Sequence, residues 1–226
     1  MKIMDVLTGM ALPRVCEVCG RELVEGEDFL CLHCRAGMRA RLIRDAGACV
    51  SRLPRAARVE QVVSLLPYSH THPLCVLIRK GKYNNRPYLI EGLARIYAEM
   101  LVADGALEGV DVLMPVGMHW FKRMRRGYNQ AEVIARTVGG MAGIEVGRPV
   151  RARRWHGPQA RNTATARLEN VRGMFAPVDA QSLAGLHVAI VDDILTTGAT
   201  MSEAIRAVMP GMPKAISVLT LAITNN

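Results

Sequence analysis

Aromatic residues are scarce in this chain of 226 residues, where phenylalanine, tyrosine and tryptophan together make up only 4%. Trp120, Phe121, Tyr128 and Trp155 lie in its most basic stretch. They are enough to stack one or two nucleobases, but they do not form the aromatic pattern of an RNA-recognition motif. That class of nucleic-acid-binding domain is therefore excluded.

Long apolar runs, internal repeats and low-complexity tracts are also missing. No window approaches the 18 apolar residues that suggest a membrane-spanning helix, so we expect no membrane insertion. Residues 1–12 are mildly apolar, but Asp5 interrupts them and no clear cleavage site follows. We therefore expect a globular, cytoplasmic protein, and an apolar fraction of 50% is enough for a sizeable core.

The positive charge of the chain is concentrated in one region. Residues 119–172 contain twelve Lys or Arg and three acids, which accounts for the whole net charge of +9. Such a stretch attracts polyanions. It predicts pyrophosphate, a nucleotide or a nucleic-acid backbone as the class of ligand.

Four of the six cysteines are spaced like metal ligands. Two Cys-x-x-Cys pairs are separated by eleven residues, and a glycine follows the first pair. Two disulfides are the alternative, but without a secretory signal a structural zinc site closed by four thiolates is favoured. His33 is expected to be exposed rather than coordinating, and Cys49 and Cys75 are expected to be ordinary apolar residues. The predicted zinc ligands are Cys16, Cys19, Cys31 and Cys34.

The rest of the chain is organised around residues 187–200, where an apolar run leads to two carboxylates and a hydroxyl-rich loop. Residues 188–191 are expected to form a central strand of a parallel sheet, buried on both faces. Asp192 and Asp193 follow at its carboxyl end, where open α/β sheets bind ligands. Neighbouring strand residues point to opposite faces, so the two acids are expected to share a ligand only if the chain turns there.

The loop after the two acids is typical of a phosphate site. Its amides and hydroxyls, with the dipole of the following helix, suit a monophosphate, and the carboxylates suit sugar hydroxyls. A receiver domain is an alternative, but only 33 residues follow Asp193. A Walker nucleotidase would need a Gly-x-x-x-x-Gly-Lys-Ser/Thr string, which does not occur. A solvated loop after an ordinary strand is the remaining alternative to a phosphate site formed by Thr196, Thr197, Gly198, Ala199 and Thr200.

This combination of strand, acids and loop resembles the phosphoribosyl pyrophosphate (PRPP) signature of type I phosphoribosyltransferases. Further motifs narrow the resemblance to the competence-associated ComF family, and together they span nearly the whole chain. One departure is His156, beside Trp155, where the family pattern has threonine. The motifs are the four-cysteine module, Lys82-Tyr83, Met114-Pro115-Val116 before His119-Trp120, Arg126-Gly127-Tyr128-Asn129-Gln130-Ala131, and Gln159, Arg167, Asn170-Val171 and Phe175.

The resemblance implies a type I phosphoribosyltransferase-like fold with a small N-terminal zinc module. Alternating strand and helix patterns after residue 58 agree with a largely parallel α/β sheet flanked by helices. Residues 80–85 are expected to turn, and residues 152–172 to form a mobile hood. The predicted domains are a zinc-binding module with linker, 1–50, and a phosphoribosyltransferase-like domain, 51–226. Strands are expected at 61–68, 111–116, 145–151, 174–178, 188–191 and 215–223, and helices at 36–43, 72–78, 88–102, 128–141 and 199–209.

The resemblance also implies how such a site would act. PRPP would enter with Mg²⁺, its 5′-phosphate would bind residues 196–200, and pyrophosphate would be displaced at the anomeric carbon. The other implied contacts are Val116, Gly117 and Met118 through their amides, Arg123 and Arg126 as charge partners of the pyrophosphate, Arg161 and Arg167 from the hood, and Asp192 and Asp193 at the ribose hydroxyls.

Three functional classes remain open at this point. The favoured one is a PRPP-dependent phosphoribosyltransferase whose nitrogenous acceptor is unidentified. The second, implied by the resemblance and favoured by the basic stretch, is a non-catalytic protein that handles single-stranded DNA in natural competence. The third is a regulatory module that binds PRPP as a signal while the cysteine module contacts DNA or a protein of the competence machinery. His156 has no assigned role.

Overall fold

The computed structural model of the chain describes residues 13–37, 41–45, 51, 53–54, 57–83, 85–148, 150–152, 173–179 and 181–224. The chain divides into two compact units, residues 1–39 and 40–226. The second unit begins before the predicted boundary at residue 51, because a short strand at residues 43–45 joins its sheet. The functions given to the two predicted domains stay predictions.

The larger unit alternates strands and helices along most of its length, and the smaller unit contributes the short helix α2 (Leu32–Gly37). Among the described residues, no helix combines the length and the apolar character that crossing a membrane requires. The elements of the larger unit are β1 (Ile43–Asp45), β2 (Val59–Pro67), α3 (Pro73–Tyr83), α4 (Pro87–Ala103), β3 (Val112–Pro115), α5 (Trp120–Arg126), α6 (Gln130–Ala142), β4 (Glu145–Val146), β5 (His187–Leu195), α8 (Ala199–Val208), the 3₁₀ helix η3 (Met209–Gly211) and β6 (Ala215–Ile223).

The strands form a six-stranded sheet in the order β1-β2-β6-β5-β3-β4. All neighbouring pairs are parallel except β1 and β2. The predicted α/β class with a largely parallel sheet is therefore confirmed. The predicted helix at 36–43 is wrong for residues 41–43, because Ile43 pairs with Ser64 in an antiparallel edge strand and packs against the core. Residues 38–40 lie outside the described residues.

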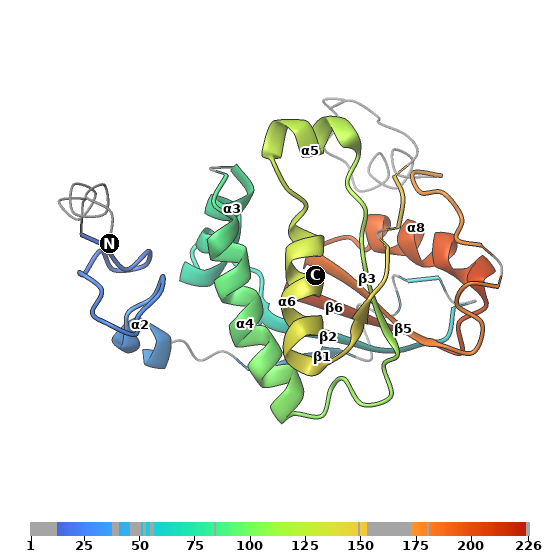
Figure 1. Cartoon of the computed structure of the whole chain (residues 1–226), viewed down its shortest axis with the longest axis horizontal. Coiled ribbons are helices and arrows are strands. Elements are labelled where there is room, and N and C mark those ends of the chain that lie inside the picture. Colours follow the sequence, from blue (N-terminus) through green and yellow to red (C-terminus); the bar gives the residue numbers. More distant parts are fainter. Residues whose placement is uncertain are drawn as a thin grey trace, which may run out of the picture. The chain divides into compact units, whose positions relative to one another are not determined.

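Helices cover both faces of this sheet (Figure 1). α4 and α6 pack against one face, where the Tyr97 hydroxyl donates to the carbonyl of Val63 at 2.6 Å. α8 packs against the other face, where its Ile205 joins the core with Val188 and Ile190 of β5. β5 is thus buried on both sides, as its uninterrupted apolar run predicts.

α3 continues through residues that were expected to form a turn. Gly81 lies inside this helix, and a Cβ atom there would sit 2.8 Å from the side chain of Ile90 in α4. The glycine therefore marks a close approach of two helices rather than a turn. The prediction of a turn from residue 80 is wrong for residues 80–83, and the longer helix brings Lys82 to the edge of the sheet.

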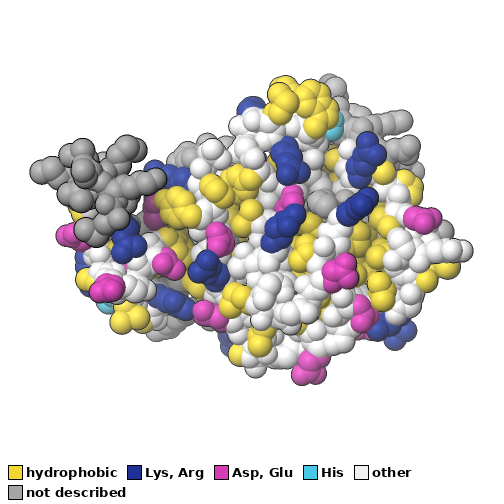
Figure 2. Space-filling view, viewed as in Figure 1, with side chains coloured by type: hydrophobic (Ala, Val, Ile, Leu, Met, Phe, Trp, Pro, Cys, Tyr) yellow, Lys and Arg dark blue, Asp and Glu magenta, His cyan; other side chains and the backbone are white. Residues whose placement is uncertain are grey.

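α5 is a helix that the apolar pattern did not predict. None of its seven residues is buried, so it has no core-facing stripe to reveal it. Figure 2 shows apolar side chains at the molecular surface in the region of α5. Its ends are well defined, because His119 Nδ1 accepts the amide hydrogen of Phe121 at 3.3 Å, and Gly127, with φ at 86°, donates to the carbonyl of Arg123 at 2.7 Å.

β5 extends beyond its neighbour β3 at the carboxyl end of the sheet. β3 stops at Pro115, opposite Val191, whereas β5 continues beside β6 as far as Leu195. The strand therefore ends later than expected, at Leu195 rather than Val191, whereas the turn follows at residue 196 as predicted. Asp192 and Asp193 still belong to the strand, and both nevertheless line the cavity described below. This step between strands provides the space in which a pocket opens.

The predicted hood lies almost entirely outside the described residues, and so do Trp155, His156, Gln159, Arg161, Arg167, Asn170 and Val171. At its borders, two weakly predicted strands are shorter than expected. The first is reduced to β4, and in place of the second, Phe175 forms an isolated bridge with Ala152.

Candidate functional site

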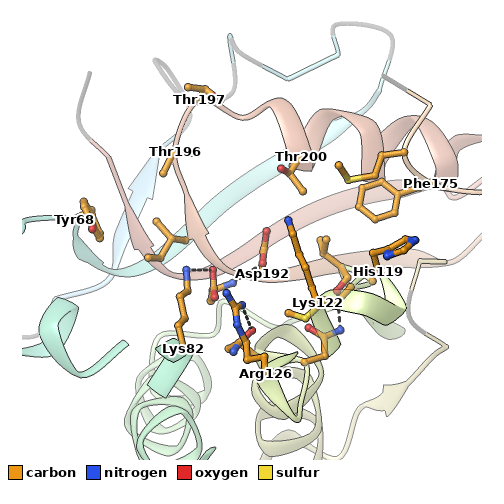
Figure 3. Close-up of a pocket in the computed structure, with 18 of the residues that line it drawn as sticks. Tyr68, Lys82, His119, Lys122, Arg126, Phe175, Asp192, Thr196, Thr197 and Thr200 are labelled. Carbon is orange, nitrogen blue, oxygen red and sulfur yellow. Dashed lines mark hydrogen bonds and ion pairs between the residues drawn. The ribbon is translucent and has the colours of Figure 1, made fainter. Parts of the chain in front are cut away.

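A cavity of about 660 Å³ opens at the carboxyl end of the sheet (Figure 3). This volume is typical of small-molecule sites. Its walls come from β5, the loop before α8, the turn after β3, α5 and the end of α3. Most of the contacts expected from the sequence meet here, namely Val116, Gly117, Met118, Arg126, Asp192, Asp193, Thr196, Thr197 and Thr200.

The two carboxylates have different partners. Lys82 Nζ lies 2.9 Å from Asp193 Oδ1, and both side chains are less than one-fifth exposed, at 17% and 11%. The backbone amide of Asp193 donates to Asp192 Oδ1 at 2.8 Å. Asp193 is thus paired with a lysine from α3, whereas the carboxylate of Asp192 turns toward the middle of the pocket (Figure 3).

This arrangement perturbs the protonation of Asp192. Burial in the pocket and the neighbouring Asp193 carboxylate raise the pKa of Asp192 to about 7. The Asp193 amide, Lys82 and Arg126 act in the opposite direction but do not outweigh the burial. Strongly shifted groups of this kind cluster at functional sites, and Asp192 exchanges its proton near neutral pH.

Two cations of α5 also face the carboxylates. Lys122 and Arg126 lie one helical turn apart and line the cavity (Figure 3). Arg126 Nη1 donates to Gln130 Oε1 at 2.8 Å, which orients its guanidinium. Partial desolvation in the pocket and the nearby Arg126 lower the pKa of Lys122, whereas Asp192 raises it. The basic wall of the pocket is therefore opposite its acidic floor.

Arg123, expected from the sequence to be a charge partner in the site, does not line the cavity. It lies 3.6 Å from Glu132 and is 58% exposed. The reason is helical geometry, since a residue next to Lys122 is rotated about 100° away from it. Lys122 occupies the position that the sequence analysis gave to Arg123.

The motif at residues 126–130 holds the walls of the pocket together. The Tyr128 hydroxyl donates to the carbonyl of Gly81, beside Lys82, at 2.8 Å. Asn129 Nδ2 donates to the carbonyl of Val116 at 3.0 Å, and its Oδ1 accepts the Ala131 amide as the cap of α6. The motif thus joins α3, the turn after β3 and α6 around the cavity.

The turn after β3 requires a glycine. A Cβ at Gly117 would lie 1.8 Å from the backbone oxygen of Val150, so no other residue fits without moving the chain. The Val116 amide donates to the Val191 carbonyl at 2.8 Å. That amide is already used within the sheet, which contradicts its expected contact with a ligand and leaves those expected of Gly117 and Met118 as predictions.

The threonine loop forms the opposite wall. Gly198, with φ at 76°, starts α8, and its carbonyl accepts the Ser202 amide at 2.7 Å. Gly198 and Ala199 are buried and do not line the cavity, so their expected contacts with a ligand stay predictions, whereas Thr196, Thr197 and Thr200 line it. The first amides of a helix have no acceptor within the helix, so this end of α8 suits an anion.

Several pocket residues had no role in the sequence analysis. Tyr68 and His70 follow β2, and Met174 lies beside Phe175 at the border of the described residues. Lys82 had appeared only as part of a family motif, and Lys122 only as one of many cations. If residues 120–126 are drawn as a helix, Lys122 falls on the same face as Arg126, whereas Arg123 falls on a different face. This pattern would have favoured Lys122 over Arg123 as a pocket residue.

The smaller unit contains a second candidate site. The Sγ atoms of Cys16, Cys19, Cys31 and Cys34 all lie within 4.8 Å of one another, and those of Cys19 and Cys31 are 3.7 Å apart. Four thiolates around zinc at 2.3 Å would be about 3.8 Å apart, so the cluster is compatible with zinc. His33 is exposed and lies outside the cluster, and Cys75 is buried elsewhere, in the larger unit.

Comparison with known proteins agrees with this fold and pocket. Residues 124–225 match the model of the phosphoribosyl transferase domain family. This match contains the Asp pair, the threonine loop and part of α5. Over residues 124–225 the chain is therefore similar to this domain family.

Similarity to whole proteins extends further along the chain. Competence protein F of Haemophilus influenzae is 25% identical over 204 residues, covering 78% of this chain and 89% of that protein. DNA utilization protein YhgH of Salmonella typhimurium is 29% identical, covering 84% and 81%. Its counterpart in Escherichia coli K12 is 27% identical, covering 93% and 90%. The resemblance to the ComF, competence-associated proteins, together with the four-cysteine module, is confirmed.

Proposed function

We propose that the protein binds PRPP and transfers its phosphoribosyl group to a nitrogenous acceptor, with release of pyrophosphate. The observation that carries this proposal is the cavity itself. It brings a pair of carboxylates, a threonine loop at a helix N-terminus and two cations of α5 to one place. A sugar that carries a phosphate at one end and a pyrophosphate at the other has groups complementary to all three.

Each part of the cavity has one role in this proposal. The threonine loop binds the 5′-phosphate through its amides and hydroxyls. Asp192 and Asp193 accept hydrogen bonds from the ribose hydroxyls. Lys122 and Arg126 approach the pyrophosphate as charge partners, and the turn at Gly117 and Met118 offers it backbone amides. Arg161 and Arg167 remain proposed contacts from the hood.

The reaction breaks the bond between the anomeric carbon and the pyrophosphate oxygen and forms a bond from that carbon to the acceptor nitrogen. The electron pair of the broken bond leaves with pyrophosphate, and the acceptor nitrogen gives up its proton. Little covalent chemistry is left to the protein, so positioning and neutralisation of the leaving group dominate. Mg²⁺, which prefers carboxylate and phosphate oxygens, would neutralise further pyrophosphate charge next to the Asp pair.

Calorimetric titration of the zinc-replete protein with PRPP, with and without Mg²⁺, tests this proposal. We expect metal-dependent binding by the wild type and its loss in the double variant Asp192→Asn/Asp193→Asn. Asp179→Asn, which removes an exposed carboxylate outside the cavity, should bind like the wild type. Unchanged affinity in the double variant, with its fold intact by circular dichroism, would contradict the site assignment.

We also propose a second function, the handling of single-stranded DNA. It is supported by the printed names of the relatives, a competence protein and DNA utilization proteins, and by the local excess of Lys and Arg. Binding that falls steeply between 50 and 200 mM salt would support it, because each phosphate contact releases counterions. A structural zinc ion at the cysteine cluster and a cytoplasmic location complete the proposal.

A further inference from the structure

α5 turns its apolar side chains toward solvent and two of its four cations toward the pocket. Trp120 is 63% exposed, Phe121 43% and Met124 73%. Lys122 and Arg126 line the cavity on the other side of the same helix. A helix at the surface of a globular protein normally has the reverse arrangement, with its apolar stripe against the core.

Helical geometry explains how one short helix serves two surfaces. At about 100° per residue, Trp120 and Met124 share one face, whereas Lys122 and Arg126 share the opposite one. Phe121 extends the outer face, since its ring centroid lies 5.9 Å from that of Trp120 at an interplanar angle of 88°. The outer aromatic face therefore lies close to the pocket but outside it.

The charges that α5 itself carries are of one sign. The seven residues of α5 include four Lys or Arg and no acid. Arg125 is exposed on the side of Phe121, and Arg123 borders the other side, where Glu132 lies 3.6 Å away. Figure 2 shows Lys and Arg side chains below the apolar side chains at the α5 end of the molecule.

Exposed aromatic rings with arginines between them fit one class of partner best. Single-stranded nucleic acid offers unpaired bases that stack on aromatic rings and phosphates that attract arginine. In a duplex, the faces of the bases are already stacked on one another. An anionic membrane also binds helices that combine aromatic residues with cations. The names of the relatives favour nucleic acid, and the test below distinguishes the two.

We propose that Trp120 and Phe121 form a stacking platform for single-stranded nucleic acid, with Arg123 and Arg125 contacting its phosphates. This inference rests on the second function proposed above and locates it on the outer face of α5. It does not depend on phosphoribosyl transfer, because neither aromatic residue lines the phosphoribosyl pocket.

The test is fluorescence anisotropy with a labelled single-stranded oligothymidine and the full zinc-replete chain. Trp120→Ala/Phe121→Ala should weaken binding at least about tenfold, because each stacked base contributes about 1–3 kcal/mol. Tyr88→Ala removes an aromatic side chain that is 46% exposed on α4, and it should leave the affinity unchanged. Trp120→Phe keeps a ring that can stack and should retain most of the binding.

A charge variant and PRPP binding make the test specific. Arg125→Gln should reduce the slope of log affinity against log salt by about 1, whereas Arg95→Gln on α4 should not. The double aromatic variant should bind PRPP with the affinity of the wild type. A failure of the proposed stacking platform can therefore be told apart from a failure of the proposed PRPP site.

Four results would overturn the proposal. The first is wild-type protein that does not bind the oligothymidine. The second is a double variant, folded by circular dichroism, that binds it as well as the wild type.

The other two would assign the face to another partner. In one, the double variant loses affinity for a DNA duplex of the same length as much as for the oligothymidine. In the other, the double variant loses affinity only for anionic phospholipid vesicles.

Discussion

Replacing Asp192 with asparagine should stabilise the folded protein, and more so as the pH rises. Asp192 is only partly exposed and lies next to Asp193 in the pocket. Burial and that neighbouring charge raise its pKa from the ordinary 3.8 to about 7. Asparagine removes the charge and still presents an oxygen to the amide of Asp193, which donates to residue 192 at 2.8 Å.

The sign of the effect depends on which state holds the proton. Between pH 3.8 and about 7, the folded protein keeps a proton on Asp192 that the unfolded chain has released, so stability falls as the pH rises through this window. At 1.36 kcal/mol per pKa unit, the penalty is about 4 kcal/mol at pH 8 and about 2 kcal/mol at pH 5. Relaxation around the ionised pair makes these values upper limits. The advantage of the variant should therefore shrink by up to about 2 kcal/mol from pH 8 to pH 5.

Urea unfolding of the full chain at pH 5, 6, 7 and 8, without PRPP or divalent cations, measures this advantage. Asp179→Asn is the matched control, because it removes an exposed carboxylate, and it should change the unfolding free energy by less than about 0.5 kcal/mol at each pH. An Asp192→Asn variant less stable than the wild type at pH 8, or one whose gain does not change with pH, would refute the assigned ionisation.

Three further predictions concern the framework of the two sites. Gly117→Ala should lower the free energy of unfolding by about 3 kcal/mol or more, because its Cβ would overlap a backbone oxygen. The control Gly140→Ala places its Cβ in open space on a helix and should raise the free energy of unfolding by about 1 kcal/mol. Thermal unfolding measures both changes. In the same assay, Asn129→Ala should cost about 1–3 kcal/mol through loss of a helix cap and a buried hydrogen bond, and Asn129→Asp, which keeps the cap, should cost less. An Asn129→Asp variant as stable as the wild type would exclude a contribution from the bond to the turn after β3. Elemental analysis should find that Cys31→Ser abolishes bound zinc and that Cys75→Ala, which changes a buried cysteine outside the cluster, does not.

The parts of the site that lie close together in the sequence could be predicted from it. Asp192, Asp193 and the threonine loop follow a strand whose apolar run is unmistakable, and parallel strands place their carboxyl ends at one edge. The two Cys-x-x-Cys pairs could likewise be read from their spacing. For the same reason, the strand β6 and the long helix α4 were predicted with nearly their observed bounds.

The remaining features depended on side-chain direction and on contacts between distant segments. Lys82 meets Asp193 only because α3 continues past Gly81, which had been interpreted as part of a turn. Lys122 rather than Arg123 enters the pocket because of a helix that buries none of its residues and so leaves no periodic apolar signal. Local patterns carry no information about such pairings.

The ion pair between Lys82 and Asp193 means that the pocket carries its own internal counter-ion. A bare divalent cation that approaches the carboxylates must compete with an amine 2.9 Å from Asp193 and is repelled by Lys122 and Arg126. A divalent cation bound to a phosphorylated sugar forms a complex with a net negative charge, and Lys82, Lys122 and Arg126 attract that complex. Because Lys82, Lys122 and Arg126 outnumber the two carboxylates among the described residues that line the cavity, we expect it to disfavour a free metal ion and to favour an anionic metal–ligand pair.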